Sequence, residues 1–487
     1  MGAGWQFSYH PSAALPPLAW IARVEAPTVH VRCGLSVRTT ADGFVEGTWV
    51  GPSEVAALPG STTVFGSGVV ADGEQLTAVP PSHPLERLYF HRGTGATVVS
   101  NSLAAVLETC GLELDPDALY PPVFVVAADG VRNPLLDIAT NALPTAAVYF
   151  NFRLTANGGF ELGDRPREEP FTSFDEYRTR LSAALASAVS NARGYEMVVA
   201  ISSGYDSTAV AAVAAPLGCR RAVTLSAGKP VHGSSSLVDS GEPAARRLSM
   251  TVESFDRLAY LARSDLPEAE FLATGMSGEE VVMASMEVSL RRSMLLTGSE
   301  EFHLKGNPYR PGLYRGDLSA CSLTEFRLRT DFIHAPMLFF GASEHPSLMK
   351  IVESDEMRPY TVRGAYDKPI QRRLAEEAGI PRGTFATVKR RASARIHTDG
   401  LAAMAPDSAA SVIRFARAEG REPSSGDRPP IKRRHRLALR VARMLRLARV
   451  TAPLARRRRS LIHAEPALGS LLFRWAVSIV RGRYSDR

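Results

Sequence analysis

The sequence has few cysteines and no long apolar run, and both features narrow the class of protein. The four cysteines, Cys33, Cys110, Cys219 and Cys321, lie far apart among 487 residues. No pair of them has zinc-ligand spacing, and a disulfide framework is not expected in so long a chain. No apolar run approaches the ~20 residues that span a bilayer. The first residues lack a basic segment followed by an apolar one, so we expect no secretory signal and a cytoplasmic protein.

Positive charge is scarce until the last part of the chain. Residues 431–487 hold 16 lysines and arginines against two acids, so the preceding 430 residues carry a net negative charge. We therefore do not expect the main body to bind nucleic acid by charge. The basic tail, 431–487, places Arg436, Arg440 and Arg443 at helical spacing. It could lie on an anionic membrane surface, hold a nucleic acid or acidic peptide, or be a solvated extension.

Two segments with different patterns precede the basic tail. Residues 1–165 read as short strands between turns, with one helix that Ser100 or Asn101 would cap and Gly111 would end. From residue 173, a long helix is followed by alternating strands and helices, which favours a parallel sheet flanked by helices. The segments 323–339 and 366–383 read as helical. We expect domains at 1–165 and 173–395, a linker over 396–430, and the tail.

A run of small and polar residues, "SSGYDST" at 202–208, separates an apolar strand from an apolar helix. In an open parallel sheet, ligands gather at the carboxyl ends of strands near a topological switch point. Small residues let backbone N–H groups approach a phosphate, and a helix N-terminus adds positive charge. The residues available for such contacts are Ser202, Ser203, Gly204, Ser207 and Thr208.

Asp206 is unusual in an anion site because its carboxylate repels phosphate. It indicates either a bound Mg²⁺ or an N-cap of the following helix. The lysine-containing GxxxxGK[ST] loop is absent from the sequence. The loop itself remains open to two interpretations, an ordinary strand-to-helix turn or a phosphate site.

The loop and several later segments resemble one known family. "SSGYDS" is similar to the Ser-Gly-Gly-x-Asp-Ser loop of the ATP-pyrophosphatase fold, with Ser203 in place of the first glycine. Residues 5–395 resemble asparagine synthetase-type proteins, which include β-lactam synthetases and lasso-peptide cyclases. Further stretches that carry the resemblance are "LYFHRGTGATVVSNSLAAVLETCG", "RRAVTLSAG", "DSGEPAARRLSM", "MLLTGSEE" and "YDKPIQRRLAEEAGIPRGTFATVKRRAS".

The resemblance implies an α/β fold in two domains and a set of site residues. It implies an N-terminal Ntn-hydrolase-like αββα glutaminase domain, followed by an adenine nucleotide α-hydrolase-like ATP-pyrophosphatase domain that binds ATP and Mg²⁺. Leu225 and Ser226 fall on the strand that contacts adenine in the family. The remaining implied residues are Gly298, Glu300 and Glu301 of an acidic loop, with Asp206 and Glu301 as metal ligands, and a catalytic Lys389.

Single residues keep alternative interpretations. Lys389 either neutralises charge on pyrophosphate or a tetrahedral intermediate, or is a solvated lysine. Glu300 and Glu301 are candidate metal ligands or acid/base groups in a loop shorter than the family's Gly-x-Gly-x-Asp-Glu. Asp239 is either close to ATP or a plain helix cap. His334 is either a wall histidine or a base.

One departure from the family concerns the amine donor. The family's glutaminases use an N-terminal cysteine exposed by removal of the initiating methionine. Here Gly2 follows Met1, and the nearest cysteine is Cys33 in a predicted strand. We therefore expect no glutamine hydrolysis and a structural N-terminal domain.

Three functions follow as hypotheses. The first is a ligase that adenylates a small-molecule or peptide carboxylate and joins it to ammonia or an amine. The second is a degenerate homologue that binds ATP, or nothing, and acts as a scaffold. The third is a nucleic-acid-modifying ATP pyrophosphatase that uses the basic tail, although no clear nucleic-acid motif is present.

Overall fold

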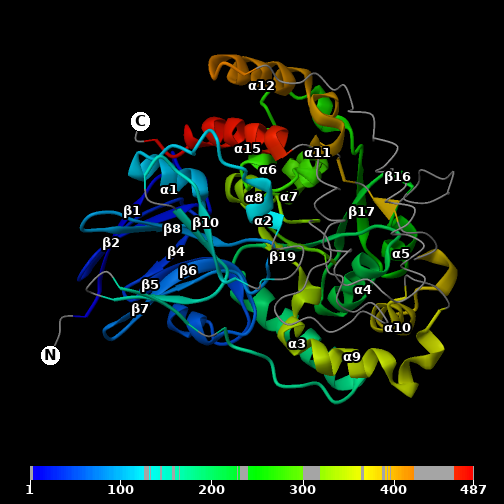
Figure 1. Cartoon of the computed structure of the whole chain (residues 1–487). Helices are drawn as coiled ribbons and strands as arrows, with labels where there is room; N and C mark the ends of the chain where they lie inside the picture. Colours follow the sequence, from blue (N-terminus) through cyan, green and yellow to red (C-terminus); the bar gives the residue numbers. More distant parts are fainter. Residues whose placement is uncertain are drawn as a thin grey trace, which may run out of the picture.

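The structure, a computed structural model, consists of two halves that pack against each other (Figure 1). It describes residues 4–125, 131, 133–142, 145–155, 159–163, 165–226, 229–230, 240–299, 319–362, 367–385, 390–391, 393–394, 396–421 and 466–485. The N-terminal half, at the left of Figure 1, contains two multi-stranded sheets. The second half, at the right, contains a parallel sheet surrounded by helices, so the chain is a mixed α/β protein as expected.

Strands of the N-terminal half form a seven-stranded and a six-stranded sheet. The first sheet has the order β1 (Gln6–Pro11), β3 (Thr28–Cys33), β2 (Trp20–Glu25), β9 (Thr97–Ser100), β8 (Leu88–Arg92), β11 (Thr145–Val148), β10 (Leu135–Ile138). The second has the order β13 (Phe160–Leu162), β12 (Phe152–Leu154), β7 (Gln75–Val79), β6 (Val64–Asp72), β5 (Gly43–Trp49), β4 (Arg38–Thr40). Neighbouring strands are antiparallel except β1 and β3, which are parallel.

The central part of the seven-stranded sheet packs on both of its faces. In β2, Trp20, Ala22 and Val24 belong to the core between the two sheets. Ile21 belongs to the core on the opposite face, where α1 (Leu103–Cys110) packs against β8 and β9. This two-residue period is what a strand between two layers requires.

Helix α1 is the helix that the sequence predicted near residues 100–111. It ends at Gly111, which is left-handed with φ 62°, as expected for a C-cap glycine. Its cap is Ser102, whose hydroxyl accepts a hydrogen bond from the N–H of Ala105, rather than Ser100 or Asn101. Short helices in the described part of this half are η1 (Val55–Gly60) and α2 (Pro121–Phe124).

The second half begins with α3 (Phe174–Asn191), the long helix that the sequence predicted, and Ser173 caps it. Its five-stranded sheet has the order β17 (Thr251–Phe255), β15 (Arg221–Leu225), β14 (Glu196–Ala200), β18 (Ser293–Leu296), β19 (Ile333–Ala335). All neighbouring pairs are parallel. The chain therefore builds the sheet outward from β14 in one direction, then returns to add β18 and β19 on the other side.

Helices and short turns of 3-10 helix connect these strands. Between β14 and β18 they are α4 (Tyr205–Ala214), η3 (Ala215–Leu217), α5 (Glu242–Arg247), η4 (Ala259–Ala262), α6 (Glu268–Leu272), η5 (Glu279–Met286) and α7 (Glu287–Leu290). Later ones are α8 (Thr324–Thr330), η6 (Met337–Phe339), η7 (Ala342–Glu344), α9 (His345–Glu353), η8 (Asp355–Tyr360), α10 (Pro369–Glu377) and η9 (Arg382–Thr384). A two-stranded pair, β16 (Lys229–Pro230) with β20 (Arg390–Arg391), is antiparallel.

The prediction of a helical segment over 323–339 was only partly correct. Residues 324–330 are helical, but Ile333–Ala335 form the edge strand β19. Asp331 ends α8 in a left-handed conformation, φ 64°, which turns the chain back toward the sheet. A segment of three residues is too short for periodicity to distinguish a strand from a helix.

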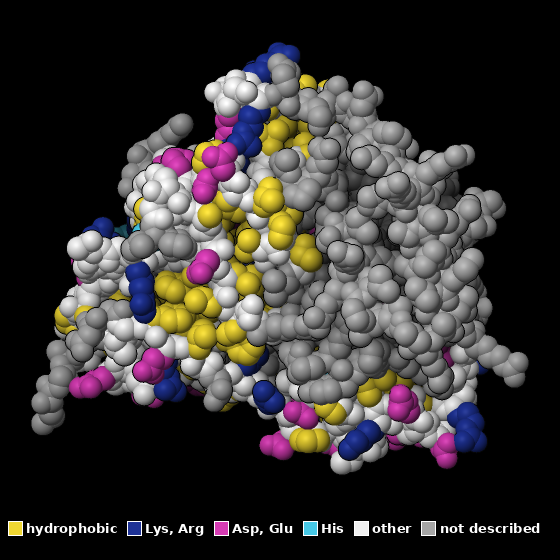
Figure 2. Space-filling view, viewed as in Figure 1, with side chains coloured by type: hydrophobic (Ala, Val, Ile, Leu, Met, Phe, Trp, Pro, Cys, Tyr) yellow, Lys and Arg dark blue, Asp and Glu magenta, His cyan; other side chains and the backbone are white. Residues whose placement is uncertain are grey.

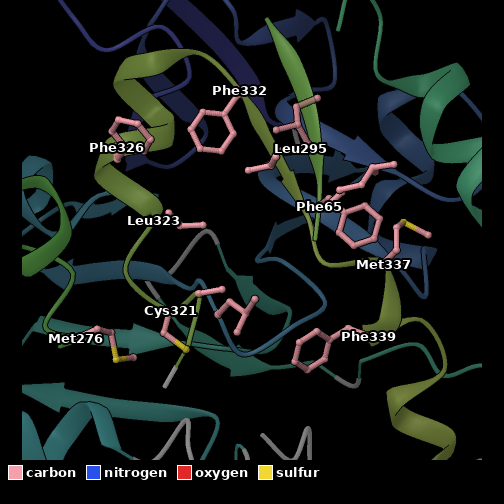
Figure 3. Close-up of a cluster of buried hydrophobic side chains, with 14 of the residues drawn as sticks. Phe65, Met276, Leu295, Cys321, Leu323, Phe326, Phe332, Met337 and Phe339 are labelled. Carbon is pink, nitrogen blue, oxygen red and sulfur yellow. The ribbon is translucent and has the colours of Figure 1, made fainter. Parts of the chain in front are cut away.

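The two halves share an apolar interface beside β18 and β19. Figure 3 shows side chains of this cluster, including Phe65 from β6, Leu295 from β18 and Met337 from η6. Phe326 and Phe332 flank it with ring centroids 5.6 Å apart. Because the interface contains residues from both halves in one continuous core, neither half buries its apolar surface alone.

The last described segment belongs to this core and is not a solvated extension. Helix α15 (Pro466–Arg481) buries Leu472, Trp475 and Val480 to within 1% exposure. It packs against α1, α2 and α6, and so against both halves. The assignment of 431–487 to one basic tail therefore needs correction for residues 466–485, where apolar residues at helical spacing outweigh the arginines. Residues 431–465 lie outside the described residues.

The range 396–430, interpreted as a linker, also contains ordered structure in its described part. It holds α11 (Ile396–Asp399), η10 (Gly400–Ala403) and α12 (Pro406–Ala418). Val412 and Ala416 of α12 are fully buried. The carboxylate of Glu268 accepts hydrogen bonds from the N–H of Ala405 and the hydroxyl of Ser408, and so holds the first turn of α12 in place.

Within the described part of the chain, none of the helices is both long and apolar enough to cross a bilayer. On the face drawn in Figure 2, acidic and basic side chains are interspersed on the described surface, and a band of hydrophobic side chains runs between them. That face therefore offers no single-sign patch among the described residues.

Candidate functional site

The 202–208 loop lies at the topological switch point of the parallel sheet. It follows β14, and the turn at residues 297–299 follows the adjacent strand β18. The crossover after β14 leads to β15 on one side, and β18 leads to β19 on the other, so the two strand ends separate the two directions of winding. In such sheets the crevice at this position is where ligands bind.

Hydrogen bonds between its own residues hold the loop in shape. The N–H of Ser202 donates to the hydroxyl of Ser207 at 3.0 Å, and the two hydroxyl oxygens are also 3.0 Å apart. The N–H of Gly204 donates to the hydroxyl of Ser202 at 3.2 Å. The hydroxyl of Thr208, fully buried, donates to the carbonyl of Gly204 at 2.8 Å. Thr208 therefore stabilises the loop from its buried side, while Ser202, Ser203 and Ser207 are half-buried.

Helix α4 begins in this loop without a hydrogen bond from a capping side chain. Its N-cap is Gly204, which has no side chain to accept from the first N–H groups of the helix. Asp206 lies in the first turn and is not the N-cap, so that alternative for Asp206 is wrong. An N-terminus capped by glycine leaves the helix dipole and its N–H groups directed at the crevice.

The turn after β18 is in direct contact with this N-terminus. A Cβ atom placed on Gly298 would lie 2.3 Å from the carbonyl carbon of Asp206 and 2.6 Å from the nitrogen of Ser207. Both distances are well below van der Waals contact, so only glycine fits at residue 298. The sequence placed Gly298 in the candidate site, and the structure brings it against the loop.

A lysine that the sequence analysis did not select completes the described site. Nζ of Lys368 lies 2.7 Å and 2.8 Å from the two carboxylate oxygens of Asp206. The Lys368 side chain is 2% exposed and that of Asp206 is 19% exposed. Lys368 is the N-cap of α10, which packs along α4. A buried ammonium is costly unless it is paired, and here it is paired with both oxygens of one carboxylate.

A second cation from α10 supports the base of the loop. The guanidinium of Arg372 donates to the hydroxyl of Tyr205 and lies over its ring, 4.8 Å from the centroid. Phe385 meets Tyr205 edge to face, with centroids 6.0 Å apart. Burial raises the pKa of Tyr205, so its hydroxyl stays protonated. Tyr205 is thus a packing residue.

The next strand contributes residues at the same edge of the sheet. Leu225 ends β15, and the hydroxyl of Ser226 donates to the carbonyl of Phe255 at 3.1 Å. Gly241 packs directly on Ile201, because a Cβ at residue 241 would lie 2.6 Å from Cγ1 of Ile201. Leu225 and Ser226 therefore lie at the carboxyl edge, with the Ser226 hydroxyl bonded to the neighbouring strand.

Several expected site residues lie outside the described residues. These are Lys389, Glu300, Glu301 and Asp239. Residues adjacent to them are described. Gly298 and Ser299 precede the acidic pair, and β20, which follows Lys389, pairs with β16 just beyond the end of β15. The backbone next to Lys389 therefore returns to the side of the sheet where Leu225 and Ser226 lie.

His334 is a buried wall residue in β19. Its Nε2 lies 2.9 Å from the hydroxyl oxygen of Thr297, the residue before Gly298. It is 2% exposed and lies behind the turn that contacts the loop. That placement supports the interpretation as a wall histidine over a base that meets a substrate.

The donor set suits a magnesium ion that is bound mainly by phosphates. Within the described ranges, no group of three or more His, Cys, Asp or Glu side chains could hold a metal by itself. Asp206 supplies one carboxylate. Mg²⁺ is commonly held by one or two carboxylates together with substrate phosphates and water, so one carboxylate fits this arrangement.

No protein-family model matches the chain, and no curated protein matches it. The resemblance to asparagine synthetase-type proteins therefore rests on the quoted motifs alone, and the chemistry it implies is a proposal.

Lys368 and Arg372 are the functional candidates that the sequence did not reveal. Lys368 lies 162 residues from its partner Asp206. The only local signal is a lysine directly before Pro369, the first residue of α10. A cation at a helix start opposes the helix dipole and needs a compensating anion, which is a reason to look for a partner there.

Proposed function

We propose that the second half binds ATP at the switch point and uses it to activate a carboxylate for amide-bond formation. The observation that carries the proposal is the meeting of the 202–208 loop, Gly298 and Lys368 where β14 and β18 end. The position supports a phosphate site on physical grounds, and the resemblance supplies the reaction. In this proposal the second half is an ATP-pyrophosphatase domain, and the stacked sheets are a degenerate Ntn-hydrolase-like αββα domain.

The proposed reaction has two steps. A substrate carboxylate oxygen attacks the α-phosphorus of ATP, the bond between the α- and β-phosphates breaks, and pyrophosphate leaves. An amine nitrogen then attacks the acyl carbon, loses a proton, and displaces AMP to give an amide. Both steps develop negative charge on phosphate oxygens, so the site must supply donors and cations there.

The described residues account for the phosphate part of this chemistry. The N–H groups at the start of α4 would donate to phosphate oxygens, and Gly298 leaves room for the backbone to approach them. Lys368 would neutralise phosphate charge, exchanging its present partner Asp206 for the nucleotide. Asp206 would then hold Mg²⁺, which supplies charge neutralisation on the leaving pyrophosphate. Leu225 and Ser226 would contact adenine.

The acidic pair and the late lysine keep the roles that the resemblance gives them. Glu301 would be a second metal ligand, Glu300 or Glu301 an acid/base group, and Lys389 the cation at the transition state. The pairing of β20 with β16, which follows β15 in the chain, supports this role, because Arg390 of β20 is the next residue after Lys389 in the sequence.

The amine would come from ammonia, a separate amine or the substrate itself. Three of the four cysteines, Cys33, Cys219 and Cys321, are buried, and Cys110 is half-buried. Cys33 is buried, and burial raises the pKa of its thiol. A buried thiol with a raised pKa is a poor nucleophile, which supports a structural N-terminal half without glutaminase activity.

ATP–pyrophosphate exchange with a panel of carboxylates tests the ligase proposal. We expect carboxylate-dependent exchange by the wild-type protein and none by Asp206→Ala. The matched control is Asp256→Ala, which removes a carboxylate that bonds only locally, to the N–H of Leu258, after β17. Nucleotide binding without exchange across a broad panel would refute the ligase and favour the scaffold.

The scaffold hypothesis has one specific observation in its favour. The ammonium of Lys368 already bonds both oxygens of Asp206, so the carboxylate is paired with a cation without any bound metal or nucleotide. If the pair is purely structural, ATP will not weaken it. Measuring the titration of Asp206 by NMR with and without Mg²⁺–ATP separates the two functions, because only the ligase requires the carboxylate to change partner.

The hypotheses for the basic segment stay as predictions. The residues that motivate them, 431–465, hold 12 lysines and arginines and one acid and lie outside the described residues. An anionic membrane surface or a nucleic acid should bind the wild-type protein in a salt-dependent manner. Replacing Arg456, Arg457, Arg458 and Arg459 by glutamine should then weaken that binding.

A further inference from the structure

A chain of buried polar contacts links the N-terminal half to the candidate phosphate loop. It begins at Arg327 of α8, which reaches across the interface to two carboxylates of the other half. Its Nη1 and Nη2 lie 2.8 Å and 2.9 Å from the oxygens of Glu46, and its Nε lies 2.5 Å from Oε2 of Glu86. The three side chains are at most 3% exposed.

Residues of the N-terminal half hold the Glu46 carboxylate in place at one end of this series of contacts. Glu46 also accepts from the hydroxyl of Ser67 at 2.9 Å and from the amide of Asn101 at 3.3 Å. The carbonyl oxygen of the Asn101 side chain accepts from the N–H of Trp20 at 3.1 Å. Arg327 is therefore anchored to β2, β5 and β6, so the position of the carboxylates is set by the sheets and not by the interface alone.

At its other end, the series of polar contacts reaches the turn after β18. One guanidinium cannot balance two carboxylates, and the second oxygen of Glu86, Oε1, faces Nδ1 of His334 at 3.6 Å. The other ring nitrogen of His334 lies 2.9 Å from the hydroxyl oxygen of Thr297. Thr297 is followed directly by Gly298, which touches the first turn of α4.

The imidazole has a polar neighbour at each nitrogen. The Thr297 hydroxyl is within hydrogen-bond distance of Nε2, whereas the Glu86 carboxylate faces Nδ1 beyond that distance and acts on the ring through its charge. The ring in turn fixes the rotamer of Thr297 at the last residue before the glycine turn. Backbone position at that point matters, because Gly298 has no space to shift toward Asp206.

We propose that His334 is a positioning residue that sets the Gly298 turn, and with it the phosphate loop, against the N-terminal half through Glu86. In this proposal the N-terminal half contributes to the site by supporting its structure, and not by supplying ammonia. The inference rests on the proposed function where it concerns nucleotide. The mechanical link from Glu86 to the loop can be tested without nucleotide.

The test compares variants that break the link at different points. Thr297→Val and Glu86→Gln each remove one contact of His334 with little change in volume. The matched control is Thr48→Val, which removes another buried threonine hydroxyl at the same interface. The Thr48 hydroxyl donates to the carbonyl of Ala188 at 2.5 Å, on α3, and takes no part in the Arg327–Glu86–His334 contacts.

The first readout is amide hydrogen exchange of peptides covering 202–208 and 294–299 in the full chain without nucleotide. We expect faster exchange in both peptides for Thr297→Val and Glu86→Gln, and wild-type exchange there for Thr48→Val. His334→Gln, which keeps a polar group near the Nε2 position, should change exchange less than His334→Leu. Unchanged exchange of 202–208 in all the link variants overturns the proposal.

The second readout is the affinity of a fluorescent ATP analogue. We expect each link variant to weaken binding by about 3- to 30-fold, and the double variant Glu86→Gln/Thr297→Val to be no weaker than the larger single effect. Additive losses, or an equal loss in Thr48→Val, overturn the proposal. If the wild-type protein binds no nucleotide, the proposed function fails, and the exchange data still decide the link.

Discussion

Replacing Gly298 by alanine probes the contact on which the candidate site depends. The added Cβ would lie 2.3 Å from the carbonyl carbon of Asp206 and 2.6 Å from its Cβ. Carbon atoms pack at about 3.5–4.0 Å, so the turn must retreat from α4 by about 1 Å. Overpacking of this kind costs about 1–3 kcal/mol, and a displacement of about 1 Å in a site can cost about 100-fold in function.

We therefore expect Gly298→Ala to lower the free energy of unfolding by about 1–3 kcal/mol in urea denaturation. We also expect it to weaken ATP-analogue binding by more than about tenfold. The matched control is Gly383→Ala in η9, where a Cβ would meet nothing within 4 Å and the glycine is not left-handed. Alanine there should be neutral or stabilise by up to about 1 kcal/mol. If Gly298→Ala matched the wild type in both measurements, β18 and α4 could not meet as described.

Three further substitutions test other parts of the argument. Lys368→Met should lower the free energy of unfolding by about 3 kcal/mol, because Asp206 loses its buried ammonium partner but keeps some exposure to solvent. The double variant Asp206→Asn/Lys368→Met should recover stability in urea titrations without recovering ATP binding in a binding assay. Burial alone would raise the pKa of Glu86, but Arg327 and His334 lower it to about 2, so Glu86 stabilises the protein above its ordinary pKa and loses that contribution as the pH falls toward 2. In Arg327→Met the unpaired Glu86 should have a raised pKa, so the deficit of about 3–5 kcal/mol at pH 7 should shrink by pH 4; a deficit independent of pH would contradict the pairing. Trp475→Ala should cost about 3–5 kcal/mol in thermal and urea unfolding, whereas Val288→Ala, at a side chain 82% exposed, should cost almost nothing.

The strand, loop and helix around residues 202–208 were predictable because their signal is local. A strand, a run of small residues and a helix occur within about 20 residues, and each element follows from adjacent side chains. The long helix α3 was predictable for the same reason, with Ser173 as cap and an apolar face over five turns. Mixed α/β structure with a parallel sheet followed from the alternation of such elements.

Contacts between distant residues were not predictable. Lys368 and Asp206 are separated by 162 residues, and no local pattern links them. The edge strand β19 was missed because a segment of three residues after α8 fits either a strand or a helix. Thr297 and His334 are 37 residues apart in the sequence, and their contact follows from the pairing of β18 with β19.

The prediction of a basic tail was wrong for residues 466–485 for a related reason. Arg474 pairs with Glu419, and Arg481 pairs with Glu108, which is 373 residues away. In the sequence these arginines extend a basic run. In the fold their partners neutralise them, and the apolar residues between them decide where the helix lies.

The placement of α15 has a consequence for biosynthesis. The hydroxyls of Tyr484 and Ser102 both donate to the carboxylate of Glu325, so residues near the start, middle and end of the chain meet at one buried group. During translation, α1 and α8 leave the ribosome long before α15, and the apolar surface that α15 covers stays open in the meantime. The nascent chain would therefore be most vulnerable to aggregation and proteolysis just before residue 466 emerges, and chaperones would be expected to act at that stage.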